Sequence, residues 1–224
     1  MSPSEELKKV VSELPEDVTL VAVSKTHPSS AIREVYDAGQ RIFGENRPQE
    51  MCEKHDLLPD DIQWHMIGHL QTNKVKMIAP FVKMIHSVDS ERLLGIIDRE
   101  AAKNNRKIDV LLEVHVAQEE SKSGWDPEEL RAYINGGSWR SYANVEIRGV
   151  MTVATQTQDQ LLIEKEFRKV RALFDDLKTH FGSQFDTVSM GMTGDYPIAI
   201  SCGATMVRIG SKIFGQRNYS ITNN

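Results

Sequence analysis

Short apolar runs rich in β-branched and aliphatic residues recur along the chain, and polar or glycine-containing segments separate them. Runs of this length and composition are typical of strands buried in a sheet. We therefore predict eight strands. They lie near residues 18–24, 41–43, 62–67, 82–88, 108–116, 145–151, 185–189 and 205–210.

The segments between these runs have a helical period. Apolar residues recur with helical spacing in 31–39, 93–97 and 161–177, which predicts amphipathic helices there. Asp126 and Pro127 mark the start of another helix, because an aspartate caps the first amides and a proline fits the first turn.

Eight strand-then-helix units predict an α/β fold. We expect a single (β/α)8 TIM barrel, with residues 1–224 forming one domain. A doubly wound open sheet is the alternative, but the chain has no obvious glycine-rich dinucleotide turn.

Composition and charge argue against several classes of protein. The net charge of -5 and the sequence pI near 5.8 do not suit a general nucleic-acid binder. Cys52 and Cys202 are too few for a disulfide framework, which predicts a reducing cytoplasm. No apolar stretch reaches membrane-spanning length and the start does not resemble a signal peptide, so we expect a cytoplasmic protein with no membrane partner.

In a barrel of this type, functional side chains lie where the strands end at the C-terminal face. The residues that follow the predicted strands are therefore the candidates for a site. They are Lys25, Gly44 to Asn46, Gly68 and His69, Ser87 to Asp89, His115, Met151 and Thr152, Ser189 to Gly191, and Arg208 to Ser211.

Lys25 is the candidate with the most specific chemistry, because a rigid strand delivers its amine to the barrel mouth. Burial lowers the pKa of a lysine by penalising the charged form, and a neutral amine attacks an aldehyde to form a Schiff base. The alternative is an ordinary lysine that opens a surface loop.

Two glycine-containing segments follow the seventh and eighth strands, where this fold commonly holds phosphate. Glycines let the backbone approach a ligand closely, and hydroxyls and exposed amides donate hydrogen bonds to phosphate oxygens. The candidate cradle consists of Ser189, Met190, Gly191, Gly210 and Ser211. Two tight turns without a ligand are the alternative.

Arg208 lies two positions before Gly210, so strand alternation points both toward the same face. A guanidinium only donates hydrogen bonds and stays protonated, so an aromatic ring nitrogen facing it must be an unprotonated acceptor. A salt bridge at the barrel rim is the alternative. A lysine, a phosphate cradle and this arginine around one mouth describe a pocket for pyridoxal 5′-phosphate (PLP).

Sequence motifs along nearly the whole chain resemble those of the pyridoxal phosphate homeostasis proteins, the YggS/PROSC family. The matching segments are 21–25, 43–50, 64–74, 86–90, 121–124, 148–151, 189–192 and 206–215. The resemblance implies the fold of the N-terminal barrel of alanine racemase, bound PLP, and a role in keeping and supplying the free cofactor without established catalysis.

The same resemblance implies roles for individual residues. Lys25 is the Schiff-base residue, Asn46 a neighbour of the cofactor, and Arg208 the partner of the ring nitrogen. Ser189, Met190, Gly191, Gly210 and Ser211 form the phosphate cradle.

A histidine pair and a polar segment are two further candidates for a site. His65 and His69 have the spacing of two metal ligands on a helix, but they straddle Gly68 at a strand end, so we expect no metal site. The polar segment 118–124 is expected to be a mobile loop, in which Lys122 is a candidate contact for an anionic ligand.

Three classes of function fit the predicted pocket: a PLP carrier, a PLP-dependent amino-acid racemase, and a lysine-dependent aldolase. We prefer the carrier, because an unprotonated ring nitrogen makes the cofactor a weak electron sink. A racemase also needs an acid or base opposite Lys25. Alanine racemase takes that group from a second domain, which we do not expect here, and Tyr142, Tyr196 and Tyr219 are unproven substitutes. The aldolase leaves Arg208 and Asn46 unused.

The partners expected of a carrier are PLP itself and the apo-enzymes that receive it. The sequence favours a monomer or weak dimer, without nucleic acid or membrane among its partners.

Overall fold

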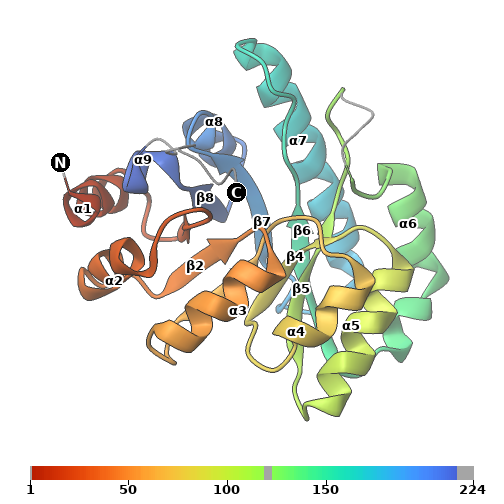
Figure 1. The fold of residues 1–224 in the computed structure, drawn as a ribbon. Coiled ribbons are helices and arrows are strands. Elements are labelled where there is room, and N and C mark those ends of the chain that lie inside the picture. The colour runs from red at the N-terminus through yellow and green to blue at the C-terminus, as the bar shows by residue number, and fades with distance from the viewer. Residues whose placement is uncertain (1, 119–122, 216–224) are drawn as a thin grey trace.

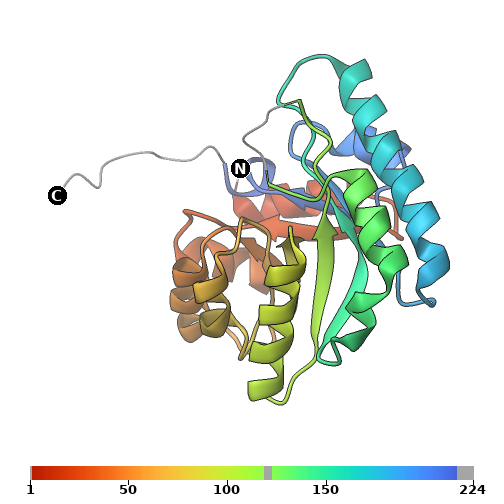
Figure 2. The same ribbon diagram turned by 90° about the vertical axis from the view of Figure 1, so that its right-hand side faces the viewer.

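Eight parallel strands close into a barrel, in which each strand pairs with its neighbours in chain order and β1 pairs with β8 (Figures 1 and 2). The computed structural model describes residues 2–118 and 123–215. The strands are β1 (Thr19–Val23), β2 (Ile42–Glu45), β3 (Gln63–Met66), β4 (Met84–Val88), β5 (Ile108–Glu113), β6 (Val145–Met151), β7 (Thr187–Met192) and β8 (Met206–Ile209). The predicted (β/α)8 barrel is confirmed, and that 1–224 form one domain stays a prediction.

Helices surround the barrel as an outer ring (Figure 1). They are α1 (Pro3–Glu13), α2 (Ser29–Asp37), α3 (Pro48–Leu57), α4 (Val75–Ile78), α5 (Glu91–Lys103), α6 (Pro127–Gly136), α7 (Gln160–Leu177), α8 (Tyr196–Ser201) and α9 (Ser211–Phe214), with short 3-10 turns at Thr72–Lys74, Ser138–Ser141 and Lys178–His180. The predicted start of α6 is confirmed, because the Asp126 side chain accepts hydrogen bonds from the amides of Glu128 and Glu129.

The α1 helix precedes the first strand and was not predicted. A capping box at Ser2 and Glu5 starts it, and it packs against α9 at the other end of the barrel sequence. Glu13 on α1 accepts hydrogen bonds from Tyr196 and Lys212, so α1 is tied to both helices that flank β8.

Strand alternation divides the core into two layers. The larger layer lies between the strands and the helices and contains Leu20 and Ala22 of β1. The smaller one fills the inside of the barrel. It consists of Val21, Met84, Leu111, Met151 and Met206. Buried polar side chains that bond to one another also lie in the interior, among them His65, His86, Ser189 and Arg208.

In the two described ranges, no helix combines the length and the apolar character needed to cross a lipid bilayer.

Candidate functional site

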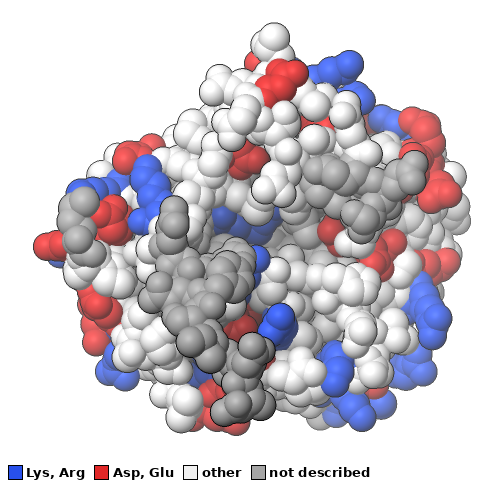
Figure 3. Space-filling view, turned by 45° about the horizontal axis from the view of Figure 1, so that its top comes forward, with Lys and Arg blue, Asp and Glu red and all other residues white. Residues whose placement is uncertain are grey.

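The C-terminal ends of the strands lie toward the top of Figure 1, and Figure 3 turns that face to the viewer. Basic side chains lie in a hollow at its centre. Lys25 leaves β1 at this end and is half-buried. The register of β1 with β8 aligns Val21 with Arg208, so closing the ring brings the residues after both strands together.

Close backbone packing at Gly210 brings the loop after β8 against the end of β1. A Cβ atom added to Gly210 would lie 3.0 Å from the carbonyl oxygen of Val23, two residues before Lys25. The Gly210 amide donates to Thr193 Oγ1 at 3.3 Å, which ties the loops after β7 and β8 together. The structure thus brings Lys25 and the predicted cradle segments to one mouth.

Arg208 is buried at this mouth, with a relative exposure of 4%. Its Nη1 donates to Ser189 O at 2.8 Å and to Ser189 Oγ at 2.6 Å, and its Nη2 donates to Thr152 O at 2.7 Å. A guanidinium has five N–H donors, so two have no hydrogen-bond partner among the described residues. Burial lowers the pKa of Arg208 to about 10, which still leaves the group cationic at neutral pH.

The rim-salt-bridge alternative for Arg208 is therefore wrong in this structure. In the described part of the chain, its three hydrogen bonds go to two carbonyl oxygens and a hydroxyl, and none goes to a carboxylate. Arg208 is therefore a buried cation with spare N–H donors.

A chain of buried histidines extends from Ser189 through the barrel interior. Ser189 Oγ lies 3.1 Å from His86 Nδ1, and His86 Nε2 lies 2.9 Å from His65 Nδ1. Arg208 can only donate to Ser189 Oγ, so the hydroxyl proton is free to bond His86. Burial lowers the pKa of His65 to about 3 and that of His86 well below its usual value, so both are neutral.

Asn46 follows β2 beside this centre, and its Oδ1 is buried with no hydrogen-bond partner in the described part of the chain. Gly68 fixes the position of Asn46, since a Cβ there would lie 2.6 Å from Asn46 O. A buried polar atom without a partner is costly. It therefore marks a place where a ligand can bond.

Glu113 ends β5 on the same face. Its carboxylate accepts from Ser123 Oγ, and burial raises its pKa above the ordinary value. Arg208 offsets part of that effect. Sequence reasoning did not single out Glu113, because the predicted strand 108–116 placed it inside the strand, whereas β5 ends at Glu113.

The three predicted cradle residues on β7 differ in where their side chains lie. Ser189 points into the barrel and is bonded to Arg208, whereas the Met190 side chain is fully buried in the layer between strands and helices. Only the Met190 backbone could therefore touch a ligand at the mouth. Gly191 has a φ of 92° and packs against α8, where a Cβ would lie 2.6 Å from Ala199 Cβ, so its glycine also has a structural cause.

A second lysine, Lys54, bonds the residue before Lys25 and was not predicted as a functional candidate. Lys54 on α3 is 5% exposed and bonds Ser24 O, Glu45 and Glu50. Sequence alone could not find it, because its partners come from β1, β2 and α3.

Several weighed residues lie away from the mouth. His65 is in the barrel interior, whereas His69 is an exposed loop residue paired with Asp89, so the two do not face one point. The Tyr196 hydroxyl is engaged with Glu13 and Lys212 among the outer helices. Tyr142 lies against Gly95 of α5. Tyr219 and Lys122 fall outside the described residues.

The barrel and its mouth define the class of protein, which is that of the alanine racemase N-terminal domains. The sequence model of that family, "Alanine racemase, N-terminal domain", matches residues 4–218. Within this class, the chain belongs to the family of the pyridoxal phosphate homeostasis proteins. The family expected from the motifs is confirmed.

Two relatives that carry the name pyridoxal phosphate homeostasis protein show how much of the chain the similarity covers. The one from Aquifex aeolicus is 42% identical over 201 residues, which are 89% of this chain and 87% of the relative. The one from Haemophilus influenzae is 40% identical over 211 residues, 92% of this chain and 88% of the relative.

The solved structures of PipY from Synechococcus elongatus are similar in fold and sequence. The structure without PLP has a TM-score of 0.90 to this chain at 38% identity and covers 96% of this chain and 100% of PipY. The structure with PLP bound has a TM-score of 0.88 at the same identity and coverage.

Proposed function

We propose that this protein binds PLP at the C-terminal mouth of the barrel and holds it on Lys25, in the service of cofactor homeostasis in the cytoplasm. The observation that carries the proposal is the pairing of two groups at one mouth. A lysine leaves β1, and a buried arginine on the neighbouring β8 has two N–H donors without a partner among the described residues. PipY, whose structure has PLP bound, supports the same ligand.

The residues at the mouth fit the chemical groups of PLP. Lys25 supplies a primary amine, and PLP when bound supplies an aldehyde that condenses with an amine and releases water. Arg208 would face the ring nitrogen with its spare N–H donors, because a permanent donor needs an acceptor. The Asn46 amide, whose Oδ1 has no protein partner in the described chain, would contact the cofactor.

The phosphate would lie against the loops after β7 and β8. Ser211 carries the hydroxyl of this cradle, and Gly210 holds the second loop close to β1. Ser189, Met190 and Gly191 would contribute backbone, because the Ser189 hydroxyl is bonded to Arg208 and His86. All eight residue roles are proposals.

The placement of Tyr142 and Tyr196 favours a carrier over a racemase. A racemase needs a proton donor or acceptor across the ring from Lys25, and the hydroxyl of Tyr196 is instead bonded to Glu13 on α1. Arg208 is held cationic and donates only, so it would keep the ring nitrogen of a bound cofactor unprotonated and would weaken carbanion chemistry. We therefore propose sequestration and delivery of PLP to apo-enzymes, by a protein that is a monomer or weak dimer.

An absorbance titration with PLP tests the proposal, with borohydride reduction and peptide mass spectrometry on the same samples. We expect a visible absorption band and the reduced cofactor mass on Lys25. Lys25→Ala should lose both and keep its melting temperature, because truncating a half-buried strand-end lysine leaves no core cavity. Lys54→Ala would not be a suitable comparison for Lys25→Ala, because Lys54 is buried and its truncation would also destabilise the fold. A protein that takes up no PLP would refute the proposal.

A further inference from the structure

An ionic cluster of buried and partly buried side chains lies beside the chain at Lys25, and we define it as Ser24, Glu45, Glu50 and Lys54. Lys54 is its centre, with Nζ 2.8 Å from Ser24 O, 2.7 Å from Glu45 Oε1 and 2.7 Å from Glu50 Oε1. An ammonium has three N–H donors, so these three bonds saturate it. Lys54 is thus held as a fixed cation.

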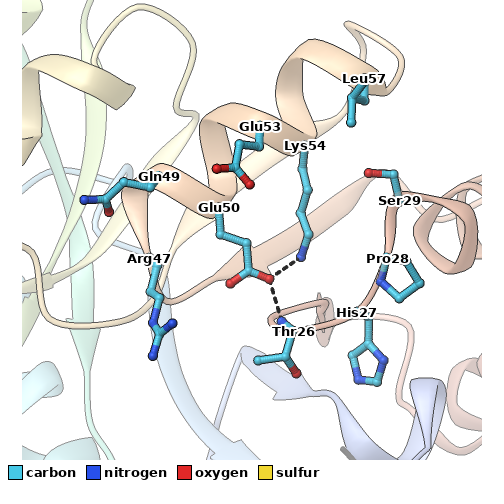
Figure 4. A pocket seen from close by; sticks show the side chains of 10 residues that line it. All are labelled: Thr26, His27, Pro28, Ser29, Arg47, Gln49, Glu50, Glu53, Lys54 and Leu57. Carbon is cyan, nitrogen blue, oxygen red and sulfur yellow. Dashed lines mark hydrogen bonds and ion pairs between the residues drawn. The ribbon is translucent and has the colours of Figure 1, made fainter. Parts of the chain in front are cut away.

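Both chain neighbours of Lys25 are bonded to this cluster. Ser24 donates its hydroxyl to Glu45 Oε1 at 2.6 Å, in addition to the bond that its carbonyl accepts. Thr26 donates its backbone N–H to Glu50 Oε1 at 2.5 Å. Figure 4 shows Glu50 reaching from α3 to this amide, at the edge of a cavity of about 730 Å³. The backbone is therefore fixed on each side of Lys25.

The conformation of Thr26 explains why such a restraint is needed. Its φ is 67°, in the left-handed region that β-branched residues rarely adopt. The other non-glycine residue with positive φ in the described ranges is Asn105, a residue type that tolerates this region. The hydrogen bond that the Thr26 amide donates to Glu50 stabilises a turn that a threonine disfavours by itself. This turn sets the direction of the chain just after Lys25.

Stability alone is a weak reason for the cluster. Glu45 is fully buried, its Oε2 has no hydrogen-bond partner in the described chain, and burial raises the pKa of its carboxyl. Buried ion pairs of this kind are often no more stabilising than apolar packing of the same volume. What the cluster supplies is a defined geometry around one residue.

We propose that Lys54 is a positioning residue for Lys25, acting through the Ser24 carbonyl and, by way of Glu50, through the Thr26 amide. The two lysines divide their roles: Lys54 is the saturated cation that fixes the turn, and Lys25 presents the amine to the mouth. This inference rests on the proposed function, since it concerns how that amine meets its ligand.

The test uses two variants and a matched control. Lys54→Met removes the ammonium but leaves the fully buried Glu45 carboxylate without its cation. The double variant Lys54→Met/Glu45→Gln is therefore made as well, because it removes both buried charges. Lys83→Met is the control, because Lys83 also donates to a carboxylate, Asp109 Oδ2 at 2.8 Å, but lies before β4 at the opposite end of the barrel. Should the Lys54 variants not fold, Glu50→Ala tests the same link, because it removes the acceptor of the Thr26 amide at a side chain that is 20% exposed.

The first measurement is the dissociation constant for PLP, with and without Lys25. Loss of Lys54 should weaken binding by about tenfold when Lys25 is present, and by about twofold or less in the Lys25→Ala background, where attachment is impossible. Lys83→Met should change neither value. An equal loss in both backgrounds would show that Lys54 only supports the fold, and would overturn the proposal.

The second measurement needs no cofactor and is hydrogen exchange at the Thr26 amide. We expect exchange to be about tenfold faster in Lys54→Met/Glu45→Gln than in the wild type or in Lys83→Met. Adding Thr26→Asn should restore cofactor attachment, because asparagine tolerates a left-handed turn. If the wild type binds no PLP, the proposed function fails, and unchanged Thr26 exchange would separately overturn the role of Lys54.

Discussion

Replacing Ser189 by alanine should destabilise the barrel, although it removes only one oxygen atom. Ser189 is fully buried, and its hydroxyl stands between the Arg208 guanidinium and the His86 ring. The substitution leaves the Ser189 carbonyl in place, so Arg208 keeps that bond and loses only the one to Oγ. His86 Nδ1 loses its partner in the chain of histidines.

The magnitude follows from these two losses. A hydrogen bond to a charged group contributes about 1.5–3 kcal/mol, and a buried acceptor left without a partner costs about 1–3 kcal/mol. Because the small alanine lets neighbours relax, we take the low end of both ranges and expect a loss of about 2.5 kcal/mol. For a chain of this length, that loss lowers the melting temperature by about 5–10 °C.

Urea denaturation and thermal melting of the protein without added PLP measure this loss. Ser201→Ala is the matched control, because the Ser201 hydroxyl donates to Ile198 O at the exposed end of α8 and should contribute no more than about 0.5 kcal/mol. If Ser189→Ala costs no more than Ser201→Ala, the hydrogen bonds of Ser189 with Arg208 and His86 do not stabilise the barrel, which would refute this reasoning.

Three further predictions follow from the interior, the cradle and the chemistry. Unfolded histidines titrate near pH 6.5, whereas the pKa of buried His65 is about 3 and that of His86 is well below its usual value, so the unfolded state binds more protons as the pH falls. Lowering the pH from 7 to 5.5 should therefore lower the free energy of unfolding by about 2–3 kcal/mol, and the variant His65→Gln/His86→Gln should lack this loss. An equal shift of the urea midpoint in the wild type and the variant would contradict the prediction. Gly210→Ala should weaken PLP binding by about tenfold in equilibrium dialysis, because its Cβ would press on Val23 O, whereas Gly194→Ala, with nothing within 4 Å, should not; equal affinities would argue against the cradle. Deuterium at the α-carbon of amino acids should exchange no faster with the loaded protein than with free PLP, and sustained faster exchange would favour an enzyme.

Much of the fold could be predicted because the barrel strands are short, apolar and separated by turns. All eight predicted strands have a counterpart, and 145–151 agrees in both bounds with β6. The α1 helix could not be assigned from the same signal. It lies outside the repeating units, and its packing on α9 is a contact between distant parts of the chain.

The candidate site was predictable only as a set of strand ends. Position in the barrel gives Lys25, Arg208 and the loop glycines, because every parallel strand ends at the same face. Side-chain direction did not follow, as Met190 shows by facing the helices. The Lys54 cluster and the His65–His86 pair depend on contacts between different strands and helices, which the apolar pattern of the sequence does not record.

The pairing of β1 with β8 has a consequence for biosynthesis. A ribosome releases β1 and Lys25 early, whereas β8, which carries Arg208, emerges only after the rest of the barrel. A nascent chain therefore exposes the amine long before the arginine and the second cradle loop can join it. If Lys25 holds the cofactor as proposed, capture should wait for the ring to close, so that loading of a newly made chain reports the completion of folding.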